Sequence, residues 1–200
     1  MRSLFILFVC GLLSHTVIAQ EGWSSKYINL GFNSTKLKVE DFDESIKSKF
    51  GINLTSGRTF FFNKEPIADM LRFGLDWSWV DAHYSKFTDE DFDEEFSMQK
   101  LNLGMQAGPS VTVMPVDNLK IKAHLRYAPS YSLFYDADEE LYTAFENYFI
   151  PGLTVSYGAV GLGLEYRGGS GKYDFSGEEE GGEKVKLKSS GMRFYVSFSF

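Results

Sequence analysis

The stretch Leu71-Arg72-Phe73-Gly74-Leu75-Asp76-Trp77-Ser78-Trp79 alternates strictly between two kinds of side chain. Every odd position holds a large apolar group, and every even position holds a polar residue or glycine. Successive side chains of a β-strand point to opposite faces, so this stretch has one wholly apolar face. The pattern predicts a strand whose two faces meet different surroundings.

The same period of two recurs along the chain. Three further stretches carry it clearly: 101–107, 119–127 and 192–200. Four stretches carry it more weakly: Tyr27 to Asn33, Phe50 to Phe61, Leu153 to Tyr157, and Val160 to Arg167. The alternation is broken at Ser56 to Arg58, where we expect a β-bulge. We therefore predict an all-β protein of eight antiparallel strands.

The connections between these strands alternate in length. Short ones are expected at 63–69, 114–118 and 158–159, and long ones at 34–47, 86–98, 136–147 and 168–183. The long segments hold 20 of the 27 acidic residues. Short turns alternating with long loops are typical of an up-and-down barrel, and all the long loops then lie at one strongly negative end.

Composition excludes several classes of protein. The 200 residues carry a formal net charge of −7, which argues against a nucleic-acid partner. The content of 19 Phe, 11 Tyr and 19 Gly argues against a helical bundle. The single cysteine, Cys10, lies in the amino-terminal segment, so the rest of the chain has no thiolate for zinc binding or nucleophilic catalysis.

Residues 1–19 have the pattern of a cleaved signal peptide. Arg2 supplies a positive start, Leu4 to Leu13 an apolar run, and Val17-Ile18-Ala19 a plausible cleavage site. We predict that the folded domain is 20–200. The uncharged run from Asn147 to Leu164 approaches the roughly 20 residues of a membrane-spanning helix, but its proline, its glycines and its alternation favour two strands around a turn.

The polar register of the predicted strands contains nine of the 19 glycines, at positions 31, 51, 74, 104, 108, 158, 161, 163 and 191. A solvated outer face does not need glycine, whereas the crowded interior of an eight-stranded barrel does. The apolar face is then the outside. Trp77, Trp79 and Phe194 on an aqueous surface would exceed the usual apolar patch, so we expect them to contact lipid.

An exported chain with these eight segments, ending in Phe194-Tyr195-Val196-Ser197-Phe198-Ser199-Phe200, resembles the small outer-membrane β-barrels of Gram-negative bacteria. The resemblance implies a single eight-stranded antiparallel up-and-down transmembrane barrel in the cell outer membrane. It also implies contact with outer-membrane lipid and lipopolysaccharide, and recognition of the last strand, which ends at Phe200, by the barrel-assembly machinery. An even strand number predicts periplasmic termini and four external acidic loops. The resemblance does not specify an activity.

Charged residues on the predicted interior face offer a first candidate site. They are Arg72, Asp76, Lys120, Lys122, His124, Arg126, Glu165, Arg167 and Arg193. Buried charges persist when they are paired and hydrogen-bonded, so we predict a plug of ion pairs that fills the lumen. The alternative is a narrow ion path through a small pore.

A second candidate is Asp81, His83 and Ser85, spaced two apart and predicted to face outward above Trp77 and Trp79. Carboxylate, imidazole and hydroxyl are the groups used in acyl transfer. His83-Tyr84-Ser85 also resembles the His-x-Ser of outer-membrane lipid A deacylases, but no acid follows Ser85 at that family's spacing. A polar strand end beyond the aromatic belt explains the same residues.

Asp89, Asp91 and Asp93 match the start of a calcium loop, but Glu94 replaces its glycine and Lys100 its bidentate glutamate. We therefore predict no metal, cofactor or catalytic residues. The leading hypothesis is a non-enzymatic scaffold that presents four acidic loops. The alternatives are an outer-leaflet lipid A-modifying enzyme and a small pore.

Overall fold

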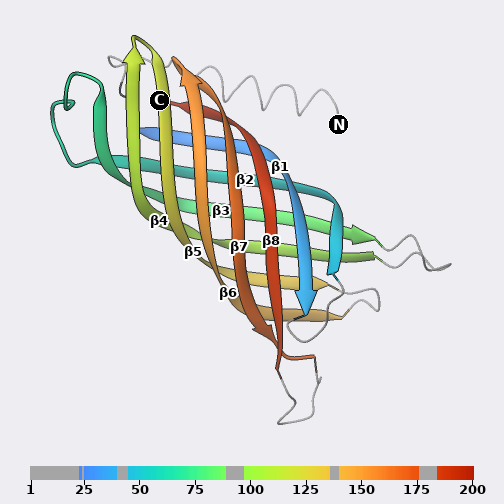
Figure 1. Ribbon diagram of the computed structural model, residues 1–200. Coiled ribbons are helices and arrows are strands. Elements are labelled where there is room, and N and C mark those ends of the chain that lie inside the picture. The colour runs from blue at the N-terminus through green and yellow to red at the C-terminus, as the bar shows by residue number, and fades with distance from the viewer. Residues whose placement is uncertain (1–22, 24, 40–44, 89–96, 136–139, 176–183) are drawn as a thin grey trace.

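The computed structural model describes residues 23, 25–39, 45–88, 97–135, 140–175 and 184–200. They form eight strands: β1 Lys26–Val39, β2 Ser45–Phe61, β3 Leu71–Thr88, β4 Ser97–Val116, β5 Leu119–Tyr135, β6 Leu141–Tyr157, β7 Val160–Tyr173 and β8 Val185–Ser199. Each strand pairs antiparallel with its neighbour in the chain, and β1 pairs with β8 to close the barrel (Figure 1). The predicted all-β, eight-stranded antiparallel barrel is confirmed. Residues 1–19 lie outside the described residues.

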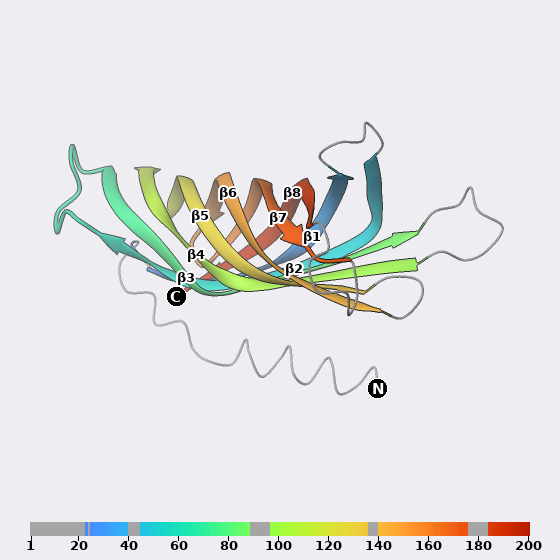
Figure 2. The same cartoon turned by 90° about the horizontal axis from the view of Figure 1, so that it is seen from below.

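The two ends of the barrel differ in their connections. At the short-turn end, Asn118 follows β4 and Gly158 follows β6, both with positive φ. Asparagine and glycine adopt that conformation most readily, which is why the chain reverses there within two residues. The longer connection 62–70 lies at this end too, as does Phe200 (Figures 1 and 2). The other four connections begin at the opposite end, called the loop end below.

The strands reach further toward the loop end than the alternation predicts. β1 continues to Val39, within a stretch expected to be a loop, and β8 begins at Val185, ahead of the alternation that starts at Met192. Large apolar residues no longer occupy the outward positions there, so the sequence pattern fades while backbone pairing continues. The fourteen-residue β1 thus runs past the point where its lipid-facing pattern stops. Among the described residues, no helix has the length and apolar content needed to cross a membrane.

The apolar face is on the outside, as predicted. Trp77 is 39% exposed, Trp79 51% and Phe194 60%, whereas inward-facing Asp76 and Arg193 are fully buried. Glycine makes room inside, since a Cβ on Gly163 would lie 2.1 Å from the ring of Tyr195. The barrel therefore has an apolar exterior and a polar, crowded interior.

A bulge in β3 reverses the predicted facing of its second half. Ser78 pairs with Gln106 and Asp81 with Gly104, so β3 has one residue more than β4 over this interval. Trp79 and Val80 both face outward, and the inward register moves from even to odd positions. The prediction of a bulge at Ser56 to Arg58 of β2 is wrong about the strand that carries it. A register shift does lie between Ser56 and Gly57, but the additional residue is on β3.

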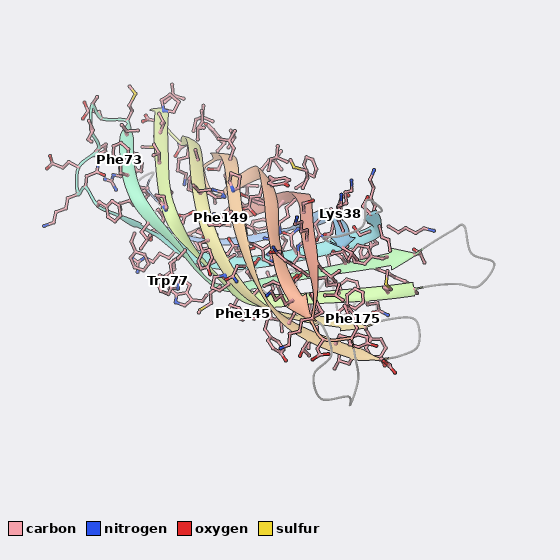
Figure 3. All side chains as sticks on the ribbon, turned by 60° about the horizontal axis from the view of Figure 1, so that its bottom comes forward. Lys38, Phe73, Trp77, Phe145, Phe149 and Phe175 are labelled. Carbon is pink, nitrogen blue, oxygen red and sulfur yellow. The ribbon has the colours of Figure 1, made fainter. Side chains whose placement is uncertain are left out.

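A buried apolar cluster, called the apolar cap here, fills the described interior of the barrel toward the loop end. Its buried members are Leu37, Phe87, Met98, Phe134, Ala144, Tyr173 and Leu187. The ring centroids of Phe134 and Tyr173 are 6.0 Å apart, and those of Phe175 and Tyr142 are 4.6 Å apart. Figure 3 shows Phe175 and Lys38 toward this end and Phe73 toward the other.

Candidate functional site in the charged lumen

The first ion-pair group lies in the half of the lumen nearer the short turns. The Arg126 guanidinium bridges two carboxylates, at 2.9 Å from Asp76 Oδ2 and 3.0 Å from Glu165 Oε1. It also donates to Gln106 Oε1 at 2.8 Å. Lys122 Nζ approaches Asp76 Oδ2 at 3.3 Å. Arg126 is fully buried, so these partners replace the water that it loses on folding.

The second group is centred on Asp81. Its two carboxylate oxygens accept from Arg167 Nη1 at 2.5 Å and from Arg193 Nη1 at 2.9 Å. Arg167 lies 3.7 Å from the centroid of the Tyr148 ring, in a cation–π contact. Arg193 is also 3.7 Å from Glu165 Oε2, which links this group to the first.

The third group lies beneath the apolar cap. Lys100 Nζ is 2.8 Å from Glu146 Oε1, and the other carboxylate oxygen accepts from Asn102 and Tyr148. Tyr173, a member of the cap, donates its hydroxyl proton to Ser132 at 2.6 Å. The polar interior and the apolar cap are therefore in direct contact through Tyr173.

The predicted plug is present, with one correction to its membership, which concerns Arg72. Arg72 faces inward but lies at the short-turn end, where it stacks over Trp23 at 4.3 Å and donates to the Lys64 carbonyl instead of pairing with a lumen carboxylate. Lys120 borders a polar vestibule of about 30 Å³ at the same end, room for about one water molecule. His124 joins the plug through Glu165 at 3.1 Å.

The prediction that Asp81, His83 and Ser85 face outward is wrong. All three side chains are buried in the lumen, because the bulge at Trp79 and Val80 reverses the register. The physical reason lies in the sequence itself: two adjacent apolar residues both turn to the lipid, and the odd-numbered positions after them, which include Asp81, His83 and Ser85, turn inward.

The local geometry does not form a catalytic triad. His83 Nδ1 accepts from Arg193 Nε at 3.1 Å, so the ring proton is on Nε2, which lies 3.0 Å from Thr35 Oγ1 and 3.3 Å from Ser85 Oγ. A general base for Ser85 would need a free nitrogen there and an orienting carboxylate on the other one. Here an arginine takes the place of the carboxylate.

Three lumen residues that form ion pairs were missed by sequence reasoning. Asp81 was assigned to the outer face, Glu146 to a loop, and Lys100 only to a failed calcium loop. For Asp81 the Trp79-Val80 pair was the available signal. For Glu146 the signal was weak, because outward Asn147 and inward Ile150 both interrupt the alternation of β6.

The completed lumen holds nearly balanced charge. Its ion pairs join four carboxylates, Asp76, Asp81, Glu146 and Glu165, to five cations, Lys100, Lys122, Arg126, Arg167 and Arg193. These ion pairs connect side chains of six strands, β3 to β8, inside the barrel. In the described residues no group of three or more His, Cys, Asp or Glu side chains is placed to hold a metal ion.

Comparison with known proteins identifies the fold. No family model and no curated sequence matches the chain. Neisserial surface protein A has a similar structure, with a TM-score of 0.52 and 16% identity over 88% of this chain and 97% of that one. Ail of Yersinia pestis has a TM-score of 0.46 and 13% identity over 88% of this chain and 99% of that one. The outer membrane protease OmpT of Escherichia coli has a TM-score of 0.49 and 8% identity over 88% of this chain and 97% of that one. The likeness to Neisserial surface protein A shows the fold, and with its apolar exterior the chain has the architecture of the outer-membrane β-barrels.

Proposed function

We propose that this barrel is a non-enzymatic anchor that holds its four acidic connections at the outer surface of the cell. The observation that carries the proposal is the filled lumen, in which three linked ion-pair groups lie under an apolar cap. Such an interior stabilises a scaffold and offers no described room for a substrate. Most of the acidic residues fall in segments outside the described residues.

The residues on which the lipid-modifying alternative depends are not accessible to lipid. A deacylase must bring its nucleophile to an acyl chain in the bilayer, whereas Ser85 is fully buried inside the barrel. Thr35 and Asn33 bind the same hydroxyl at 2.9 Å each. These contacts support a structural role for His83 and Ser85.

The pore alternative requires a continuous path for ions. Arg126 and Arg193 cross the lumen to reach carboxylates on other strands, and the cap covers the loop end. An ion would have to break several buried pairs to pass. The arrangement therefore favours a closed barrel.

Two measurements together test the proposal. Mass spectrometry of lipid A from cells with and without the gene should give identical spectra, and the purified barrel should not conduct in planar bilayers. A changed acylation pattern would establish an enzyme instead. Steady unitary conductance that disappears in an Asp76→Asn variant would establish a pore.

We also propose that the termini are periplasmic and the acidic connections external. Protease added to intact cells should then cleave within 89–95 or 178–183. Cleavage only after the outer membrane is breached would reverse this orientation.

The carboxyl-terminal strand is proposed as the contact for the barrel-assembly machinery. Phe200 lies outward at 49% exposure, and its backbone pairs with Lys26. Phe200→Ser should lower the amount of folded barrel in the membrane more than Phe194→Ser, which removes a ring from the same outer face of the same strand. Equal levels of the folded, unboiled band for both variants would contradict this role.

A further inference from the structure

The polar vestibule at the short-turn end of the lumen is not used by the proposed function. It lies at the end of the barrel where the carboxyl terminus is found (Figure 1). Its lining is mainly polar, with lysines from β1 and β5 and with serine and threonine side chains from β2, β4, β6 and β8. The described lining contains no carboxylate side chain. A volume of about 30 Å³ gives room for one water molecule or one monatomic ion.

Lys122 is the cation of the vestibule that a ligand can reach. Its side chain is 16% exposed, whereas that of Asp76, its carboxylate partner at 3.3 Å, is fully buried. The ammonium group also lies 4.2 Å from the centroid of the Tyr27 ring, in a cation–π contact. Lys120 lines the vestibule too and already has an interaction of its own. The accessible ammonium of Lys122 is therefore the better placed of the two to meet an anion.

The carboxylate of Asp76 has a closer cation than Lys122. Its Oδ2 accepts from Arg126 Nη2 at 2.9 Å and from Nε at 3.2 Å. Among the described residues, the ion pairs of the lumen join five cations to four carboxylates, which leaves one positive charge in excess. Each of the other four cations has a carboxylate oxygen within 2.9 Å, so the excess is at Lys122. A charge in so small a polar cavity is stabilised by a counter-ion.

A buried hydroxyl without a partner lies beside Lys122. Thr112 of β4 is the direct cross-strand neighbour of Lys122, is 3% exposed and lines the vestibule. Its Oγ1 has no hydrogen-bond partner in the part of the chain that the structure describes. Buried hydroxyls of native proteins are usually satisfied by water or an ion when no protein group reaches them. The Thr112 hydroxyl and the Lys122 ammonium are thus two donors on the wall of one small cavity.

We infer that the vestibule binds one monatomic anion of the size of chloride, held by the ammonium of Lys122 and the hydroxyl of Thr112. The anion balances the positive charge left over by the four lumen carboxylates, and it also satisfies the buried hydroxyl. A water molecule satisfies the hydroxyl but not the charge, and a cation meets Lys122 with like charge. A polyatomic anion such as phosphate exceeds the volume. The stability of the ion-pair plug then depends on a soluble anion, whether or not the barrel is a scaffold.

The test uses the full barrel in detergent micelles at constant ionic strength, with sodium chloride replacing sodium gluconate, whose anion is too large for the vestibule. Chloride binding is read from the line width of chloride-35 NMR, and stability is read from urea titration. Chloride at ten times its half-saturating concentration should lower the unfolded-to-folded ratio about tenfold at a fixed urea concentration, because it binds only the folded barrel.

Two variants test the residues that hold the anion. Thr112→Val removes only the hydroxyl, so the half-saturating chloride concentration should rise about tenfold. The matched control is Thr55→Val, which removes another buried lumen hydroxyl, one that donates to Asp81, and should leave half-saturation unchanged. Lys122→Met should abolish the chloride dependence of stability, while Asp76 keeps Arg126 as its cation. The unboiled folded band on gels verifies that each variant is a barrel.

Bromide tests the position of the anion, because it substitutes for chloride and scatters X-rays anomalously. Crystals of the wild-type barrel soaked in bromide should give an anomalous peak in contact with Lys122 Nζ and Thr112 Oγ1. Crystals of Thr112→Val soaked in the same way should give a weaker peak at this place.

Three outcomes would overturn the inference. Equal stabilisation by chloride and by gluconate would indicate a general effect of salt. Equal loss of chloride affinity in Thr55→Val and Thr112→Val would place the anion elsewhere in the lumen. Bromide peaks confined to lysines of the outer face would show that the vestibule holds water alone.

Discussion

The membrane-facing part of the barrel and its loop end are built from the same strands with opposite polarity. In β1, outward Phe32 is followed on the same face by Ser34 and Lys36, while inward Asn33 and Thr35 give way to buried Leu37. The faces exchange their character within one continuous strand.

Other strands make the same exchange at the same level. On β8 the inward face passes from Arg193 to Leu187 and the outward face from Phe194 to Lys188. Backbone pairing does not depend on which face of the strand is apolar. The surroundings on each side, lipid or water, therefore decide which face carries the apolar residues. The exchange therefore marks where the bilayer ends, and beyond it the barrel packs like a water-soluble protein with an apolar core.

The largest expected effect is on the polar interior of the membrane part. Arg126→Met leaves Asp76 and Glu165 without their shared cation and should lower the free energy of unfolding by about 3–5 kcal/mol in urea titrations. Arg58→Met, which removes an arginine from the outer face of β2, is the control and should change little. A loss below about 1 kcal/mol for Arg126→Met would mean that water reaches these carboxylates.

Substitutions on the outer face should differ in their stability cost between the membrane-facing part and the loop end. Leu30 lies midway along the outward apolar run of β1, so Leu30→Arg should cost about 2–4 kcal/mol. Lys36→Leu on the same face of the same strand should stay within about 0.5 kcal/mol. Similar costs at the two positions would contradict the placing of the bilayer edge between them.

The apolar cap should behave like the core of a soluble protein. Leu187→Ala removes buried side-chain volume and should cost about 2–3 kcal/mol, measured by urea titration. The loss should be the same in bilayers of thin and thick lipid, because the cap lies beyond them. A loss that changes with lipid chain length would place the cap inside the membrane.

The smallest effect is expected at Ser85, where hydrogen bonds alone are removed. Ser85→Ala should cost about 0.5–1.5 kcal/mol and leave lipid A unchanged. His83→Ala should cost more than Ser85→Ala, since it also leaves Arg193 Nε without its acceptor. An altered lipid A with unchanged stability would restore the deacylase hypothesis.

The sequence by itself determined the strand number, the barrel and the direction of its faces. The period of two in stretches such as Leu71 to Trp79 requires one lipid-facing surface, and the glycines of the other register require a crowded interior. Most plug members followed from the same register, because side-chain direction is a local property of a strand.

Only the tertiary structure decided the second half of β3 and the strand ends. One additional residue at Trp79 carried Asp81, His83 and Ser85 into the lumen, and whether a bulge lies in β3 or in β2 depends on pairing with both neighbours. Glu146 belongs to β6 because its backbone pairs with Ser130 of β5 and Gly171 of β7, and this pairing brings its carboxylate to Lys100 of β4. Register between distant segments is set by the pairing of whole strands, which no single stretch of sequence contains.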